Sequence, residues 1–169
     1  MSRPRNEPVQ EVKARRDAAL SRMTDAVPYM RFIGLRFDRR GNELTAILPF
    51  SQHLIGNPVL PALHGGAIGA FLESAAIVEL MWSRVWARME AGGAEADAIE
   101  AGEFGDWPKV VDITVDYLRS GLPRDAYARA TITRVGRRYA SVRVEAWQDD
   151  RAKPFAEAMV HFVMPRDPD

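Results

Sequence analysis

The sequence predicts an α+β fold in which a curved antiparallel sheet of about six strands wraps one long buried helix. Two observations carry this prediction. A run of about 22 residues from His64 is apolar on nearly every side of a helix, which is typical of a helix buried all round. Four segments with alternating apolar residues follow it, as expected for strands with one face on a core. At 169 residues, the chain is the size of one domain.

The N-terminal segment is charged, with only occasional apolar positions. It predicts a helix from Val9 to about Val27 that Pro28 closes. We expect this helix to form an N-terminal extension over residues 1–31, followed by a main domain over residues 32–165.

Two short strands are expected at residues 35–39 and 44–50, joined by a turn at Gly41-Asn42. An irregular loop leads from there to the central helix. After that helix, residues 89–107 contain six acidic residues, four glycines and no basic residue. This composition predicts a mobile acidic loop on the surface, with room for a short helical piece. A disordered insertion is favoured here over a functional lid.

Four further strands should form an antiparallel meander, with turns at Gly121-Leu122-Pro123, Gly136 and Asp149-Asp150. Each strand has one face of apolar residues at every second position. These faces are Val111, Ile113, Val115 and Tyr117; Ala126, Ala128, Ala130 and Ile132; Ala140, Val142, Val144 and Ala146; and Ala158, Val160, Phe162 and Met164.

Composition excludes several classes of function. The formal net charge is zero, so nothing global indicates a nucleic-acid or membrane partner. The chain has no cysteine, which excludes disulfides and thiolate nucleophiles, and its three histidines lack metal-ligand spacing. Glu73, Glu79 and Arg84 interrupt the longest apolar run, and residues 1–17 contain no signal-peptide core. We therefore expect a cytoplasmic protein without a metal.

The candidate chemistry lies at the start of the central helix. Gly65 and Gly66 stand where backbone N–H groups have no partner in the helix, a suitable site for a carbonyl oxygen that becomes negative during acyl transfer. Glycines here are also explained by close packing or a tight turn. Glu73 is a carboxylate in an apolar helix, so it should face a cavity or a partner subunit, where an ion pair is the alternative to catalysis.

Glu73 follows His64 by nine residues, ~14 Å along a helix axis. This distance is too long for Glu73 and the helix start to hold one carbonyl within a subunit. In a dimer with antiparallel helices, Glu73 of one chain could face the Gly65-Gly66 end of the other. We expect His64 to cap or orient the helix start. Asn57 either hydrogen-bonds a carbonyl or makes the turn before Pro58.

At these residues the sequence resembles a known family. The run Leu63-His64-Gly65-Gly66-Ala-Ile-Gly-Ala-Phe-Leu-Glu73 is similar to the signature of hotdog-fold acyl-CoA thioesterases of the PaaI-like group. Weaker matches follow at Tyr117-Leu118-Arg119 and Gly136-Arg137-Arg138. The resemblance implies a hotdog fold, an acyl-CoA substrate, no separate cofactor because CoA is part of the substrate, and a homodimer or homotetramer with active sites between subunits.

The resemblance also implies roles for individual residues. The N–H of Gly65, beside Gly66, would polarise the thioester carbonyl, and Glu73 of the other subunit would be the nucleophile or the base that activates water. Asn57 would approximate the family's upstream amide side chain, although it lies one position too early. The candidate contacts for CoA phosphates are Arg119, Arg137 and Arg138.

Two departures leave alternatives open. Ile77 and Val110 or Val111 stand where some family members carry a water-holding hydroxyl, which favours a non-catalytic acyl-CoA-binding protein. A hotdog β-hydroxyacyl dehydratase is suggested by His53 with its spaced prolines. That family needs an acid fourteen residues after the histidine, and this sequence has Ala67 there.

Overall fold

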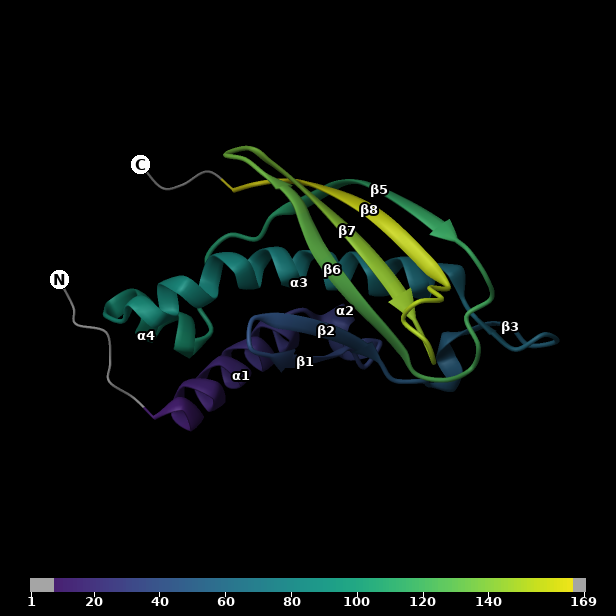
Figure 1. The fold of residues 1–169 in the computed structure, drawn as a ribbon, viewed down its shortest axis with the longest axis horizontal. Coiled ribbons are helices and arrows are strands. Elements are labelled where there is room, and N and C mark those ends of the chain that lie inside the picture. The colour runs from purple at the N-terminus through teal and green to yellow at the C-terminus, as the bar shows by residue number, and fades with distance from the viewer. Residues whose placement is uncertain (1–7, 166–169) are drawn as a thin grey trace.

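The computed structural model describes residues 8–165 and confirms the predicted architecture. A six-stranded antiparallel sheet with the order β1-β2-β6-β7-β8-β5 curves over one long helix, α3 (Gly65–Ala91), as Figure 1 shows. The buried faces of α3 and the sheet form one continuous core, in which Trp82 and Phe71 of α3 and Phe162 of the sheet are the largest side chains. This arrangement is the hotdog fold.

The N-terminal segment forms the predicted helix, and a second short helix follows it. Helix α1 (Val9–Asp25) stops before Pro28, which starts a second, short helix, α2 (Pro28–Phe32). Proline suits this position because a backbone N–H in the first turn has no acceptor within the helix, so its absence costs no hydrogen bond. Leu20 and Met23 bury one side of α1 in the core. The extension is therefore packed on the main domain.

Strands β1 (Arg36–Arg40) and β2 (Glu43–Leu48) form the predicted hairpin around the turn at Gly41. Arg39 of β1 is buried and binds the carboxylate of Asp17 in α1 at 2.8 Å, which attaches α1 to this side of the sheet. A short 3-10 turn, η1 (Gln52–Leu54), and a small hairpin, β3 (Ile55–Asn57) with β4 (Ala62–Leu63), lead into α3.

The remaining strands are β5 (Lys109–Tyr117), β6 (Ala126–Val135), β7 (Tyr139–Trp147) and β8 (Ala156–Val163). The last three form a meander, but the prediction that β5 belongs to it was wrong. Strand β5 pairs with β8 and lies at the edge of the sheet, so the β5–β6 connection passes two strands, β8 and β7. An irregularity in the ladder between Val110 and Asp112 also turns Val111 outward, against the predicted face.

The short helical piece expected within residues 89–107 is present, but the prediction that this segment is a disordered insertion was wrong. This segment contains helix α4 (Ala94–Ala101), and Ala96, Ile99 and Phe104 are buried. Its acids find basic partners elsewhere in the chain, which composition alone does not reveal. Arg88 of α3 binds Glu95, and Arg15 of α1 binds Glu100 at 3.2 Å. The segment therefore joins α1 to the end of α3.

Helix α3 is long and apolar enough to cross a membrane by length and composition. It runs beneath the sheet, however, and 56% of its most apolar window is buried inside the domain. Its hydrophobicity is accounted for by the core that it fills, as expected of the central helix of this fold.

Candidate active site

His64 caps the N-terminus of α3, as predicted for a capping or orienting residue. Its imidazole Nδ1 accepts a hydrogen bond from the N–H of Gly66 at 2.9 Å. Because Nδ1 acts as the acceptor, a neutral ring carries its proton on Nε2. A side chain on Gly66 would place its Cβ 3.0 Å from the imidazole, so glycine lets the ring approach the N–H closely.

The backbone of His64 is fixed on both sides. Its N–H donates to the carbonyl of Leu54 at 2.7 Å, and its carbonyl accepts from the N–H of Ile68 at 3.0 Å. Gly56 makes this approach possible, because an added Cβ there would lie 2.7 Å from Cα of His64. The β3–β4 hairpin thus holds the first residue of the helix in place.

The two glycines at the helix start differ in their hydrogen bonding. The N–H of Gly66 is occupied by His64, whereas the N–H of Gly65 donates to no acceptor among residues 8–165. A half-exposed N–H at the positive end of a 27-residue helix can bind a partly negative oxygen. The structure therefore separates Gly65, with an available donor, from Gly66, which serves the cap.

Asn57 lies at the tip of the β3–β4 hairpin. Its side-chain oxygen accepts hydrogen bonds from the N–H groups of Val59 at 3.0 Å and Leu60 at 3.1 Å. This is the local turn that asparagine commonly makes before a proline. The carboxamide oxygen is thereby used within the hairpin, and Asn57 makes no side-chain hydrogen bond to the helix start among the described residues.

One side of α3 remains open. Gly66, Ala70, Glu73 and Ile77 follow one another at three- or four-residue spacing, and none of them is buried. We call this stripe the open face of α3. The next turn on this side, Leu80 and Met81, is buried, and Arg84 one turn later is again only partly buried. The carboxylate of Glu73 is half-buried and makes no hydrogen bond or ion pair within the described part of the chain. Glu73 is therefore exposed to whatever covers the open face.

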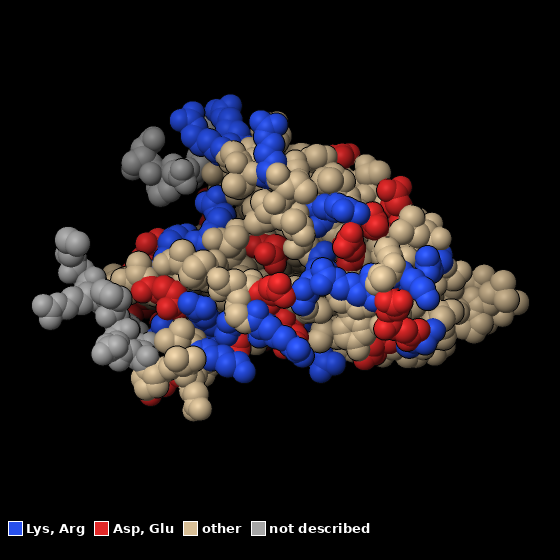
Figure 2. Space-filling view, viewed as in Figure 1, with Lys and Arg blue, Asp and Glu red and all other residues tan. Residues whose placement is uncertain are grey.

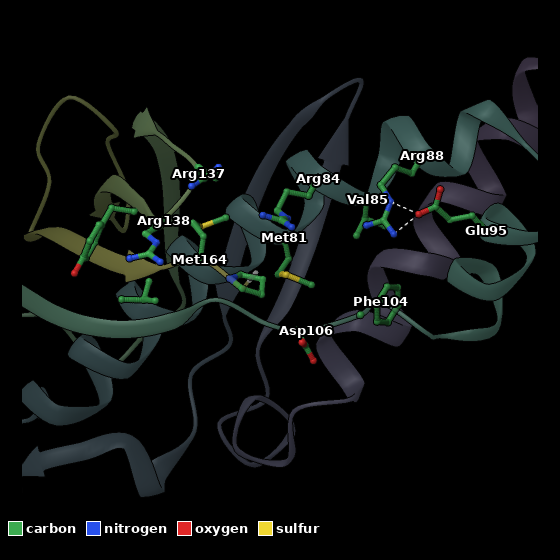
Figure 3. Close-up of a pocket in the computed structure, with 14 residues that line it drawn as sticks. Met81, Arg84, Val85, Arg88, Glu95, Phe104, Asp106, Arg137, Arg138 and Met164 are labelled. Carbon is green, nitrogen blue, oxygen red and sulfur yellow. Dashed lines mark hydrogen bonds and ion pairs between the residues drawn. The ribbon is translucent and has the colours of Figure 1, made fainter. Parts of the chain in front are cut away.

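A cleft of 1490 Å³ lies beside the C-terminal half of α3. Four arginines line this arginine cleft: Arg84 and Arg88 from α3, and Arg137 and Arg138 from the β6–β7 turn on the other side (Figure 3). Two acids, Glu95 and Asp106, also line it, so the positive charges outnumber the negative ones. Figure 2 shows that basic side chains gather where the β6–β7 turn projects from the molecule.

Only some of the predicted site residues come together. His64, Gly65 and Gly66 form one unit at the start of α3, and Glu73 lies two turns along the same helix. Arg119 follows Tyr117 near the helix start, where its N–H donates to the carbonyl of Phe155 at 3.1 Å. Arg137 and Arg138 lie at the other end of α3. One subunit therefore does not bring the three predicted phosphate contacts into one site.

The structure also adds residues that the sequence did not single out. Tyr117, considered only as part of a strand motif, donates its hydroxyl to the carbonyl of Gly65 at 2.8 Å. Arg84 and Arg88 both line the cleft because they lie four residues, about one turn, apart on α3. Helical spacing from Glu73 could have found both arginines. Nothing in the sequence indicated the contact of Tyr117.

The residues of the dehydratase alternative do not form a catalytic pair. The ring of His53 lies 5.1 Å from that of Phe32, and its Nδ1 is 2.8 Å from the hydroxyl of Ser51. No described carboxylate is hydrogen-bonded to His53. Residues 8–165 also contain no cluster of three or more side chains suited to a metal ion.

A six-stranded sheet wrapped on a single central helix places the protein in the hotdog class. The profile of the acyl-CoA thioesterase N-terminal domain family matches residues 57–163. The chain belongs to this family, and it is a thioester hydrolase.

Individual relatives agree with this assignment. The medium/long-chain acyl-CoA thioesterase YigI of Salmonella typhimurium is 29% identical over 127 residues, which cover 74% of this chain and 78% of that protein. A solved structure from Chromobacterium violaceum is 39% identical and covers 93% of this chain and 98% of its own, with a TM-score of 0.63. A protein of Shewanella oneidensis related to the thioesterase superfamily shares the fold, with a TM-score of 0.68 at 21% identity over 94% of this chain and 99% of its own.

Proposed function

We propose that this protein hydrolyses acyl-CoA thioesters to a free acid and CoA, with Glu73 as the nucleophile or general base and the N–H of Gly65 as the carbonyl donor. One observation carries the proposal: α3 has an available N–H at its start, on Gly65, and an unpaired carboxylate on its open face, on Glu73. An N–H fixed before the reaction stabilises the oxyanion without reorganisation. A nearby carboxylate then attacks the carbonyl carbon or takes a proton from water.

The two groups would act together across a homodimer. Glu73 comes nine residues after His64, ~14 Å along the helix, so one subunit does not supply both to the same carbonyl. The free edge of β5 supports a dimer in which two copies of this strand pair antiparallel. Tyr117 at one end of β5 contacts the start of α3, whereas Lys109 at the other end borders the cleft region. Such pairing would run the two α3 helices antiparallel and place Glu73 of one chain near Gly65 of the other. Two such dimers could further associate as a tetramer.

The arginine cleft is suited to the phosphate groups of CoA. Arg84 lies eleven residues beyond Glu73, ~16 Å along the axis of α3, which is comparable with an extended pantetheine arm. The apolar Ile77, which is only partly buried, lies between them along the helix. Guanidinium groups such as those of Arg137 and Arg138 bind phosphate oxygens with paired hydrogen bonds. Arg119, near the helix start, would reach the same substrate from the partner subunit.

The medium/long-chain acyl class named for the curated relatives is the substrate class that we propose for this chain. Asn57 would contribute its amide nitrogen to the substrate carbonyl, since its oxygen closes the hairpin turn. No separate cofactor and no metal would be needed. We place the protein in the cytoplasm, where acyl-CoA is available to it.

The proposal is tested by measuring thiol release from a panel of acyl-CoAs of increasing chain length, with the wild type and Glu73→Gln. We expect release by the wild type and loss of release in the variant. Binding of CoA esters without turnover in either protein would instead establish a non-catalytic acyl-CoA-binding protein. Water addition to an enoyl-CoA without thiol release would establish a hydratase.

A further inference from the structure

Tyr117 is the last residue of the edge strand β5, and 55% of it is exposed. Its hydroxyl nevertheless has a specific partner, because it donates to the carbonyl of Gly65 at 2.8 Å across 52 residues of sequence. The bond joins the sheet edge to the first residue of α3. This contact lies beside the N–H to which we assign the substrate carbonyl.

The Tyr117 bond completes the fixation of the backbone around that N–H. The peptide before Gly65 is held through the carbonyl of His64, which accepts from Ile68. The peptide after Gly65 is held on its N–H side by the imidazole of His64 and on its carbonyl side by Tyr117. Both peptide planes that flank Gly65 are thus anchored, while its own N–H remains available.

Glycine makes such anchoring necessary and also allows it. Gly65 has no Cβ to restrict its dihedral angles, so its peptide planes are held less firmly at the helix start than those of any other residue would be. An added Cβ on Gly65 would lie 3.3 Å from the Tyr117 oxygen, tighter than an ordinary contact. The same addition on Gly69, one turn later, would lie 3.9 Å away, which is ordinary contact. The phenol is therefore fitted to a glycine at position 65 in particular.

We propose that Tyr117 is a positioning residue of the active site, whose hydroxyl fixes the orientation of the Gly65 N–H through the adjoining carbonyl. The inference rests on the proposed function and deepens it. Oxyanion stabilisation depends on donors that are already aimed before charge develops. Without the hydroxyl, the Gly65 N–H is still present but its orientation is less restricted. The effect should therefore fall on kcat and not on substrate binding.

The test is Tyr117→Phe, which keeps the ring and removes only the hydroxyl. We expect kcat for acyl-CoA hydrolysis to fall about 10-fold, a fraction of the loss expected on removing a donor entirely. KM and the melting temperature should stay near the wild-type values. Tyr29→Phe is the matched control, because Tyr29 is also exposed and its hydroxyl makes no hydrogen bond within residues 8–165; we expect no change.

A second set of variants separates positioning from general stability. Gly65→Ala should shift the phenol, weaken its hydrogen bond and lower kcat, so adding Tyr117→Phe to it should cost less than Tyr117→Phe costs in the wild type. Gly69→Ala should leave the full effect of Tyr117→Phe intact. An unchanged kcat in Tyr117→Phe would overturn the inference. A fall in kcat accompanied by a clear fall in melting temperature would also overturn it, because the hydroxyl would then serve general stability. A wild type that releases no thiol would overturn the proposed function and this inference with it, whereas an active wild type tests Tyr117 alone.

Discussion

Two glutamates on α3 stand six residues apart and lie on different faces of the helix. Of the four neighbours of Glu73 one turn away, Gly69, Ala70 and Ile77 are only partly buried and Ala76 is fully buried. Of the four neighbours of Glu79, Ala75, Ala76 and Trp82 are almost fully buried and Ser83 is exposed. Burial raises the pKa of Glu79 to about 7, whereas Glu73 remains on the open face. The same side chain on the same helix is thus available for chemistry at one position and costs stability at the other.

Replacing Glu73 should give the largest effect on function. Glu73→Gln keeps the shape of the side chain but removes its basicity and nucleophilicity, so we expect kcat to fall ~10²–10⁴-fold. The free energy of unfolding should hardly change, because no described hydrogen bond or ion pair is lost. Steady-state thiol release and urea unfolding measure the two quantities. A large loss of stability in this variant would mean that Glu73 is structural.

Replacing Glu79 should have the opposite outcome. The folded-state pKa of this acid is raised from 4.5 to about 7, so the folded protein binds the proton more tightly than the unfolded chain. The resulting destabilisation is absent below the unfolded pKa, grows as the pH rises towards 7 and is complete above it. Glu79→Gln should therefore stabilise the protein at pH 8 by roughly 2–3 kcal/mol, with no gain near pH 4.

Urea unfolding of the wild type and Glu79→Gln across this pH range checks the prediction, and thiol release should be retained. Equal stabilities of the two proteins at every pH would show that burial does not disfavour the charged carboxylate. Loss of thiol release would remove the functional distinction between the two glutamates.

The sequence predicted the helix that carries both glutamates and the sheet around it, because apolar periodicity is a local signal. It did not distinguish the faces of that helix. Glu73 and Glu79 both interrupt one apolar run, and only the packing of sheet and α1 decides which is covered. The acidic segment at 89–107 and the edge position of β5 were missed for a related reason. An arginine from a distant part of the chain, Arg15, helps to order the acidic segment. Strand pairing across the sheet determines the position of β5.

In the candidate site, too, the local features were predictable from the sequence and the long-range contacts were not. His64, Gly65 and Gly66 are adjacent in sequence, and their capped helix start followed from that order. Tyr117 reaches Gly65 across 52 residues, and no local pattern indicates such a contact. The separation of Arg119 from Arg137 and Arg138 likewise depends on where the strands end.

The arginine cleft, at the end of α3 far from Gly65, is expected to contribute to substrate binding and not to the chemical step. Arg138→Ala should raise KM for acyl-CoA about 10-fold with little change in kcat, because phosphate binding is far from the reacting carbon. Arg143→Ala, on the exposed outer side of the sheet, is the control and should leave KM unchanged. Initial rates over a range of acyl-CoA concentrations provide the measurement. A fall in kcat with constant KM would place Arg138 outside the binding site.

The smallest expected effect on stability is at the start of the helix. His64→Ala removes the cap on Gly66 and should lower the free energy of unfolding by about 1 kcal/mol. His64→Asn restores a capping acceptor and should recover most of that stability. Urea unfolding of the three proteins checks both expectations. Equal stability of wild type and His64→Ala would show that the cap contributes nothing.

The central claim is that each active site combines Glu73 of one subunit with Gly65 of its partner. Subunit mixing tests it most directly. Glu73→Gln and a Gly65→Val variant, each inactive alone, are unfolded together, refolded and assayed for thiol release. Random pairing makes half of the dimers mixed, and each mixed dimer has one intact site, so about a quarter of wild-type activity should return. Mixed dimers that form but release no thiol would contradict the shared site.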